Sequence, residues 1–420
     1  MDKETLSNYG WIVICVMVLA VMIALATPFG SFIADGFKAT YTGLSDTENS
    51  VLDVMIDSTG GCVHNETEFR NATTDYSGDT VCKKCGTVLE NGQYSIPSGG
   101  VYTVSDGTIL NGDNGDKMPV TVSDGDMYVY SDYQYTYSAV DNGWSVTRNP
   151  SVSQWKKTYG DILGIINGQP IKNMYQTFYN CSSMEIAPKI PDTVISMYET
   201  FNGCTGLLSA PEIPYGVTDM YRTFTGCKKL KEGPVLPETL VNMHLTFWSC
   251  GGLEVAPVIP NSVTNMNGAF LGCSALKTYV GSTDPDGDFS NFIIPQNVTN
   301  LHQAFQGCSL LTTAPSIPEK VEVMSMTFAY CESLVSAPTI PSSVTNLKEA
   351  FRNCTSLTGT ITIDANIPNS TDNYFWCFYT VDFEAQNITL TGTCARLDSL
   401  AAYGATNYCA TCNGKCNGGH

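Results

Sequence analysis

A Phe-x-x-Cys pair returns at a nearly constant interval from residue 178 onward, and this period limits the possible folds more than any other feature. Successive pairs are 23 residues apart, except for one interval of 35 residues. The pairs are Phe178/Cys181, Phe201/Cys204, Phe224/Cys227, Phe247/Cys250, Phe270/Cys273, Phe305/Cys308, Phe328/Cys331 and Phe351/Cys354. A fixed period of roughly 20–50 residues predicts a solenoid, in which each coil buries its apolar face against its neighbours.

Other apolar residues keep the same period. From residue 194 onward, a Val or Leu precedes each Phe by seven residues, and a Met or Leu precedes it by four. We expect these side chains to point inward and stack in continuous rows. Proline cannot donate a backbone hydrogen bond, so the repeated Ala-Pro and Ile-Pro pairs should end short strands and turn corners. The main strand is expected either in segments such as residues 217–220 or in the Leu-x-x-Ala segment before proline. Phe-x-Gly-Cys is expected to be a tight turn or a single helical turn.

The periodic cysteines are predicted to be buried free thiols. Adjacent coils are roughly 5 Å apart, which is within the Cα–Cα range of a disulfide. Side chains in register point in parallel directions, however, whereas a disulfide needs them to converge. We therefore expect small apolar side chains that can also donate weak hydrogen bonds and close the turn.

The repeat has the form V-T-N-M-x-x-A-F-x-x-C-x-x-L at residues 263–276. This form resembles the BspA-like leucine-rich repeats of bacterial surface proteins. The resemblance implies a mainly β solenoid with short strands and turns in each coil, here over residues 171–380. It also implies display on the cell surface and binding of host or bacterial partners, and it supplies no catalytic residues.

The residue after each Met or Leu varies from coil to coil, and such variable columns are where a solenoid carries its function. The first four members of this column are Tyr175, Tyr198, Tyr221 and His244. Their rings, one coil apart, should stack along one face, and Tyr offers a large contact area with little loss of side-chain entropy. This column is the candidate ligand-binding site. The alternative is a ladder that only stabilises itself.

The N-terminal part is expected to anchor the protein in the cell membrane. Residues 11–26 are an unbroken apolar run, and with the next residues they reach the roughly 20 residues of a membrane span. The first ten residues lack the positive region of a cleaved signal peptide, so an uncleaved anchor is favoured over cleavage after Ala26. We expect a single-pass protein that crosses the membrane through residues 11–30, with the bulk of the chain extracellular. The helix and stalk would occupy residues 1–58. The segment also resembles the N-terminal helix of a small pilin, although Cys15 stands where a type IV pilin has an acidic residue.

A small module with a structural metal is predicted at residues 59–99. Its candidate ligands are Cys62, His64, Cys82 and Cys85, two pairs of the kind that tetrahedral zinc requires. With four protein ligands the site would be closed, and zinc would stabilise the fold rather than catalyse a reaction. The region around Cys82 and Cys85 resembles small zinc-ribbon-like modules of bacterial surface proteins. A disulfide from Cys62 to Cys82 or to Cys85 is the alternative.

A Tyr-rich β module is predicted at residues 100–170. Residues 127–148 alternate between two faces, with Tyr133, Tyr135 and Tyr137 on one of them, and Asp-Asn-Gly at 141–143 indicates a hairpin turn. These Tyr side chains, beside Trp144, are expected to form the core of a sheet; stacking on sugars is the alternative.

Two further regions contain possible metal ligands. The insertion between two repeats carries Asp284, Asp286 and Asp288, but Phe289 and Pro295 stand where a calcium loop of the EF type needs Gly and Glu, so calcium is not expected. Residues 381–420 are predicted to cap the solenoid. Two disulfides or one metal ion could hold this cap through its four cysteines, which are Cys394, Cys409, Cys412 and Cys416.

Composition excludes two classes of function. A net charge of −19 argues against a nucleic-acid partner, because phosphate binding needs clustered Lys and Arg. The chain has four His, no nucleophile–base motif and no phosphate-binding Gly loop, so an enzyme is not predicted. We therefore predict adhesion, meaning recognition of an extracellular protein or glycan through the exposed face of the solenoid. The alternative is a structural subunit that self-associates into a surface filament through its N-terminal helix.

Overall fold

The computed structural model describes residues 94–282, 288–368 and 371–404, together with the backbone of five short strands outside these ranges. Those strands are β1 (Thr67–Arg70), β2 (Asp79–Cys82), β3 (Val88–Glu90), β15 (Tyr408–Cys409) and β16 (Gly414–Lys415). The chain divides into two compact units, Met1–Gly92 and Gln93–His420. In the first unit β1, β2 and β3 form an antiparallel sheet, and in the second β15 pairs with β16.

The predicted membrane segment, residues 11–30, lies outside the described residues. In the part of the chain that the structure describes, no helix is both long and apolar enough to cross a membrane. Anchoring through residues 11–30 therefore stays a prediction.

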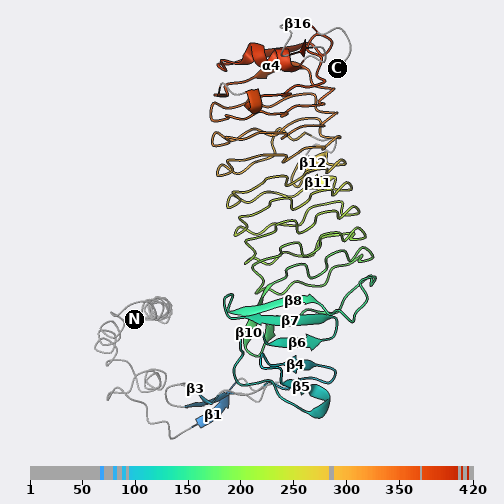
Figure 1. Ribbon diagram of the computed structural model, residues 1–420, viewed down its shortest axis with the longest axis vertical. Coiled ribbons are helices and arrows are strands. Elements are labelled where there is room, and N and C mark those ends of the chain that lie inside the picture. The colour runs from blue at the N-terminus through green and yellow to red at the C-terminus, as the bar shows by residue number, and fades with distance from the viewer. Residues whose placement is uncertain are drawn as a thin grey trace, which may run out of the picture. The chain divides into compact units, whose positions relative to one another are not determined.

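A seven-stranded sheet begins the second unit, with the strand order β5-β4-β6-β7-β8-β10-β9 (Figure 1). Its elements are β4 (Val101–Thr103), β5 (Ile109–Asn111), the 3-10 helix η1 (Gly112–Asn114), β6 (Met127–Tyr130), β7 (Tyr133–Ser138), β8 (Gly143–Arg148), β9 (Ile165–Ile166) and β10 (Gln169–Asn173). β7 and β8 form the predicted hairpin. Because β10 pairs with β8 in parallel, the sheet continues across the boundary expected between residues 170 and 171.

The Tyr side chains of β7 form a core, as the alternating pattern predicts. Tyr133, Tyr135 and Tyr137 are buried together with Trp144, whose ring meets that of Tyr137 edge-on at a centroid distance of 5.4 Å. The Trp144 indole N–H donates to the carbonyl of Ile166 at 3.0 Å, so its one polar group is satisfied. These rings offer no free face on which a sugar could stack.

The solenoid follows, and its coils lie one on another between the seven-stranded sheet and helix α4 (Leu397–Gly404) (Figure 1). Two sets of backbone hydrogen bonds alternate along the Met-to-Cys segment of each coil. In the first coil the N–H of Met174 donates to Ser196 O of the next coil at 3.0 Å, and the N–H of Phe178 donates to Thr200 O at 2.9 Å. The intervening N–H of Thr177 donates within its own coil, to Met174 O at 3.4 Å. The backbone is thereby satisfied without a long strand.

This alternation requires two residues in every coil to adopt the left-handed backbone conformation, with a positive φ angle. Gln176 and Asn180 have φ angles of 53° and 58°, and the equivalent residues of later coils have similar values. The second position is often Gly, which adopts positive φ without steric cost. Those glycines are Gly203, Gly226, Gly272 and Gly307. The Phe-x-Gly-Cys segment is therefore a tight turn, one of the two forms expected for it.

Both segments proposed for the main strand form parallel ladders between coils, and each ladder involves very few residues per coil. One ladder of parallel bridges joins Ser196 to Asp219, Asp219 to Asn242, and Asn242 to Asn265. A second ladder lies in the Leu-x-x-Ala segment, where β11 (Val255–Ala256) pairs in parallel with β12 (Thr278–Tyr279). β13 (Gly359–Thr362) and β14 (Ile388–Thr391) form a parallel pair near the C-terminal end. The prolines that follow the second ladder keep its strands short because they cannot donate to a neighbour.

The predicted inward columns form the core. Phe201 and Phe224 are fully buried, and their rings stack at 5.5 Å with an interplanar angle of 3°. The thiol of Cys204 donates to Phe178 O of the preceding coil at 3.1 Å, and Cys250 donates to Phe224 O at 2.9 Å. All the cysteines of this column are buried and free, which confirms the predicted thiols. Burial raises the pKa of the Cys250 thiol to about 12.

Both ends of the stack and the insertion are covered by packed side chains. Tyr133 and Tyr159 place their rings against Phe178 of the first coil, at centroid distances of 6.1 and 5.1 Å. Residues 374–381 form a last coil whose Phe378 stacks on Phe351 at 5.3 Å, preceded by the 3-10 helix η2 (Thr371–Asn373). In the insertion, residues 283–287 are outside the described ranges, so Asp284 and Asp286 are not tested. Phe289, which stands where a calcium loop needs Gly, is buried and packs in the core instead.

Candidate functional site

A turn built on Asn or Asp orients three of the four residues of the candidate ligand-binding column. The N–H of Tyr175 is bound by the side chain of Asn173 at 2.9 Å, that of Tyr221 by Asp219 at 3.1 Å, and that of His244 by Asn242 at 3.0 Å. Asn and Asp favour this turn because their side-chain oxygens accept from the backbone two residues ahead. The preceding Met is buried in each coil, so the next side chain projects toward the surface.

The four predicted rings come together as expected. Tyr175 and Tyr198 stack with centroids 5.1 Å apart, and Tyr198 and Tyr221 stack at 4.5 Å. His244 meets Tyr221 edge-on at 5.1 Å. Tyr175 is 46% exposed, whereas the other three are half-buried because each ring covers its neighbour. The row therefore presents ring edges and hydroxyl groups along its length, and an open ring face is left at Tyr175.

A charged cluster lies in the columns beside the rings. Glu199 accepts from the Gln176 amide at 2.6 Å and pairs with Arg222 Nη1 at 3.3 Å. The Arg222 guanidinium lies over the rings of Tyr221 and Trp248, at 5.2 and 5.3 Å from their centroids. Such cation–π contacts stabilise by about 0.5–2 kcal/mol each. The cluster fixes the orientation of the Tyr row from one side.

The surroundings shift the pKa values of two groups in the row. Burial, and then the positive charge of Arg222, lower the pKa of His244. His244 is therefore neutral at pH 7. Partial burial and the neighbouring Tyr221 and Glu199 raise the pKa of Tyr198, so its hydroxyl keeps its proton and can donate a hydrogen bond.

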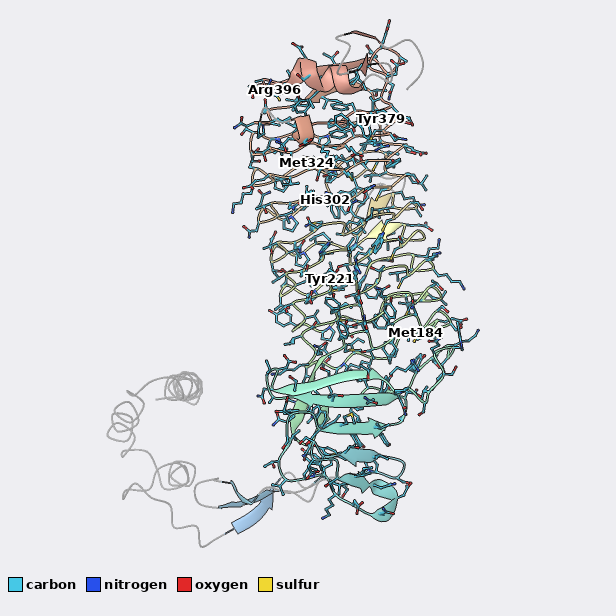
Figure 2. The ribbon with its side chains drawn as sticks, in the orientation of Figure 1. Met184, Tyr221, His302, Met324, Tyr379 and Arg396 are labelled. Atoms are coloured by element: carbon cyan, nitrogen blue, oxygen red, sulfur yellow. The ribbon has the colours of Figure 1, made fainter. Side chains whose placement is uncertain are left out.

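A second aromatic cluster, which was not predicted as a site, lies near the C-terminal end of the stack. Arg352 is paired with Glu349 at 2.7 Å, and its guanidinium lies 5.0–5.5 Å from three ring centroids. These rings belong to Tyr330, Trp376 and Tyr379. Figure 2 shows Tyr221, His302 and Tyr379 at successive heights along the stack. The sequence signal is the run NYFWCFYTVDF, in which Trp376 and Tyr379 align with Glu349 and Arg352 of the preceding coil once Phe378 is aligned with Phe351.

The predicted metal sites are not tested by the structure. Cys62, His64 and Cys85 lie outside the described residues, and Cys82 is described only as the backbone end of β2. In the ranges that are described, no three His, Cys, Asp or Glu side chains are grouped so that they could hold a metal ion. At the C-terminus Cys394 is a buried free thiol, while the side chains of the other three cysteines lie outside the described part.

Residues 172–283 and 286–407, more than half of the chain, match the family described as BspA type Leucine rich repeat region. The chain belongs to this family. The expected BspA-like solenoid is thereby confirmed. The repeat family is generally non-enzymatic.

Solved leucine-rich repeat proteins show limited likeness to this chain. A leucine-rich repeat protein from T. pallidum is 28% identical over 48% of this chain and 88% of that one, with a TM-score of 0.40. One from Bacteroides ovatus is 20% identical over 64% and 69% of the two chains, with a TM-score of 0.41. The pneumococcal vaccine antigen PcpA is 14% identical over 66% and 87%, with a TM-score of 0.29. No curated protein sequence matches the chain significantly.

Proposed function

We propose that this protein is displayed on a bacterial cell surface and recognises an extracellular protein or glycan through the exposed face of its solenoid. Family membership supports the location, because BspA-like leucine-rich repeat proteins are typically surface-exposed. Anchoring in the cell membrane through residues 11–30 is part of the proposal. The observation that carries the recognition step is the stacked row of Tyr175, Tyr198 and Tyr221, extended by His244.

The row is suited to binding because it is ordered before a ligand arrives. The backbone of each coil is fixed by hydrogen bonds to its neighbours, each ring contacts the next ring, and a turn also holds Tyr175 and Tyr221. A ligand therefore pays little entropy to order these side chains. Tyr adds a hydroxyl to a large apolar body, the combination that recurs at recognition surfaces.

The test is a binding screen of the full-length protein on a glycan array and on a panel of extracellular matrix proteins. A variant with Tyr175→Ser, Tyr198→Ser and Tyr221→Ser is screened beside it. The matched control carries Asn267→Ser and Lys348→Ser, which change the same column in coils without an aromatic row.

Specific binding that the triple variant loses and the control retains is the expected result. Equal binding by all three proteins would place the ligand elsewhere. If nothing binds and the protein instead assembles in a concentration-dependent way, the recognition proposal fails in favour of a filament subunit.

A further inference from the structure

The proline corners of the solenoid form an open apolar groove away from the Tyr row. The corner has the pattern Ala-Pro-x-Ile-Pro, and x is Lys or Glu in the first two coils and Ser or Thr in the last two. In the coils between them x is apolar. Val235 is 89% exposed there, Val258 is 59% exposed and Ile293 is 68% exposed. Exposed valines of successive coils thus form a ridge.

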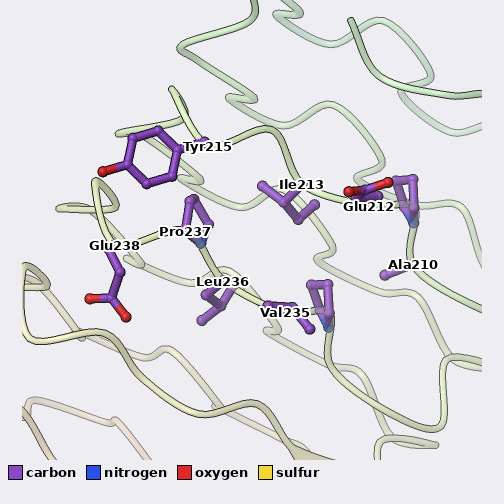
Figure 3. Close-up of a pocket in the computed structure, with 10 residues that line it drawn as sticks. Ala210, Glu212, Ile213, Tyr215, Val235, Leu236, Pro237 and Glu238 are labelled. Atoms are coloured by element: carbon purple, nitrogen blue, oxygen red, sulfur yellow. The ribbon is translucent and has the colours of Figure 1, made fainter. Parts of the chain in front are cut away.

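Two hollows lie on either side of Val235, which forms a wall of both. The larger has a volume of 710 Å³ and lies between residues 210–215 and residues 234–238 (Figure 3). The smaller has a volume of 240 Å³ and lies on the other side of Val235, toward Val258 and Val280. Tyr215, which is 73% exposed, forms part of the rim of the larger hollow. Together the hollows make one groove across several coils, called here the corner groove.

The corner groove has a fixed shape. Gly233 replaces the Ala of neighbouring coils, and a Cβ at this position would come within 2.4 Å of the Pro257 ring. The missing side chain allows the two coils to pack closely beneath the ridge. Prolines lock their own φ angles, so the corner keeps its form when a partner arrives. A rigid apolar surface binds with little ordering cost.

Its rim is acidic and has no counter-charge. Glu212, Glu232 and Glu238 line the hollows, are exposed, and form no ion pair within the described residues. No Lys or Arg lines either hollow. Glu254 in the next coil is instead paired, at 2.7 Å from Lys231 and 3.3 Å from Lys277. The corner groove therefore combines apolar walls with unneutralised carboxylates.

We propose that the corner groove docks a segment of another protein in which apolar side chains adjoin Lys or Arg. The apolar side chains would fill the hollows beside Val235, and the cationic groups would pair with the carboxylates on the rim. A protein segment fits better than a sugar, because prolines supply no N–H donors and the walls are Val, Leu, Ile and Pro. This surface shares no residue with the Tyr row and does not depend on it.

The experiment measures binding of three fluorescent pools of nine-residue peptides to the full-length protein. One pool combines Leu, Val and Phe with Lys and Arg, the second combines the same apolar residues with Asp and Glu, and the third combines Ser and Gly with Lys and Arg. The proposal predicts that the apolar-basic pool binds at least tenfold more tightly than either of the others. Binding that weakens when salt rises from 50 to 500 mM is also expected, because exposed charges are screened.

Paired variants locate the contact. Val235→Ser should weaken binding of the apolar-basic pool at least fivefold, and Glu238→Gln at least twofold. The matched controls are Val140→Ser, at a valine that is 95% exposed in the turn between β7 and β8, and Glu332→Gln, at an exposed glutamate of another coil. Both controls should bind as the unchanged protein does. All of these sites are exposed, so the variants are expected to fold, which a melting curve checks.

Three results would overturn the proposal. The first is a failure of the apolar-basic pool to bind, and the second is equal binding of the acidic pool. The third is binding that Val235→Ser and Val140→Ser leave equally strong. The variant that lacks the three Tyr rings separates this inference from the proposed function. It should bind the apolar-basic pool normally, and loss of that binding would assign the peptides to the Tyr row instead.

Discussion

Replacement of Phe224 by Ala should cause one of the largest single losses of stability in the solenoid. Phe224 is fully buried, and its ring stacks on Phe201 at 5.5 Å and on Phe247 at 5.7 Å. Truncation of a buried Phe to Ala costs about 3–5 kcal/mol of unfolding free energy. Two stacked ring contacts, worth about 0.5–1.5 kcal/mol each, are lost at the same time, which places the expected cost at about 4–5 kcal/mol.

Urea denaturation followed by circular dichroism measures this loss, and hydrogen exchange shows where it acts. Each coil contacts only its neighbours, so amide protection should fall first around residues 197–250. Phe224→Leu keeps most of the buried volume and should cost about 1–3 kcal/mol. Tyr179→Ala, at a ring that is 43% exposed, serves as the control. A loss below about 1 kcal/mol for Phe224→Ala would refute the idea that the Phe column holds the stack together.

Three further predictions follow from burial, charge and packing. The periodic cysteines should resist alkylation until the protein unfolds, since burial shields the thiols and raises their pKa; rapid modification of their peptides in native protein, mapped by mass spectrometry, would contradict this. The pKa of His244 in the folded protein lies below the ordinary 6.5, so the unfolded state binds the proton first, and the free energy of unfolding should fall as pH drops below about 6.5. In an NMR titration, the midpoint of His244 should lie below that of a free histidine, and Arg222→Gln should raise the midpoint. A midpoint equal to that of a free histidine would contradict the proposed effect of burial and Arg222. Gly233→Ala should destabilise by about 1–3 kcal/mol through overpacking against Pro257, whereas Gly216→Ala, whose nearest contact is 3.5 Å, should be nearly neutral in a thermal melt.

The period made the solenoid and its buried columns predictable. A residue that returns every 23 positions occupies the same place in each coil, so Phe, Cys and Met could be assigned inward from spacing alone. The stacking of Tyr175, Tyr198 and Tyr221 followed from the same reasoning. The burial of the Tyr residues in β7 followed from a period of two, which places alternate residues on one face of a strand.

Other features depend on geometry that spacing does not encode. The repeat pattern could not decide which of the two segments forms the main strand. Backbone hydrogen bonds between turns join most of the coils, and both segments form only short parallel bridges. The aromatic cluster around Arg352 was missed because the last coil begins 27 residues after its predecessor, from Phe351 to Phe378, and breaks the alignment of columns. The corner groove was missed because it depends on how prolines of adjacent coils pack.

A comparison of two affinities tests whether the Tyr row binds a ligand. The dissociation constant for the ligand found in the screen is measured for the unchanged protein and for the variant with Ser at residues 175, 198 and 221, with the melting temperature taken from the same samples. We expect the variant to fold and to bind about 100-fold more weakly, because aromatic anchors of an interface contribute about 1 kcal/mol or more each. Unchanged affinity together with a lowered melting temperature would contradict it, and would show that the rings serve only to stabilise the stack.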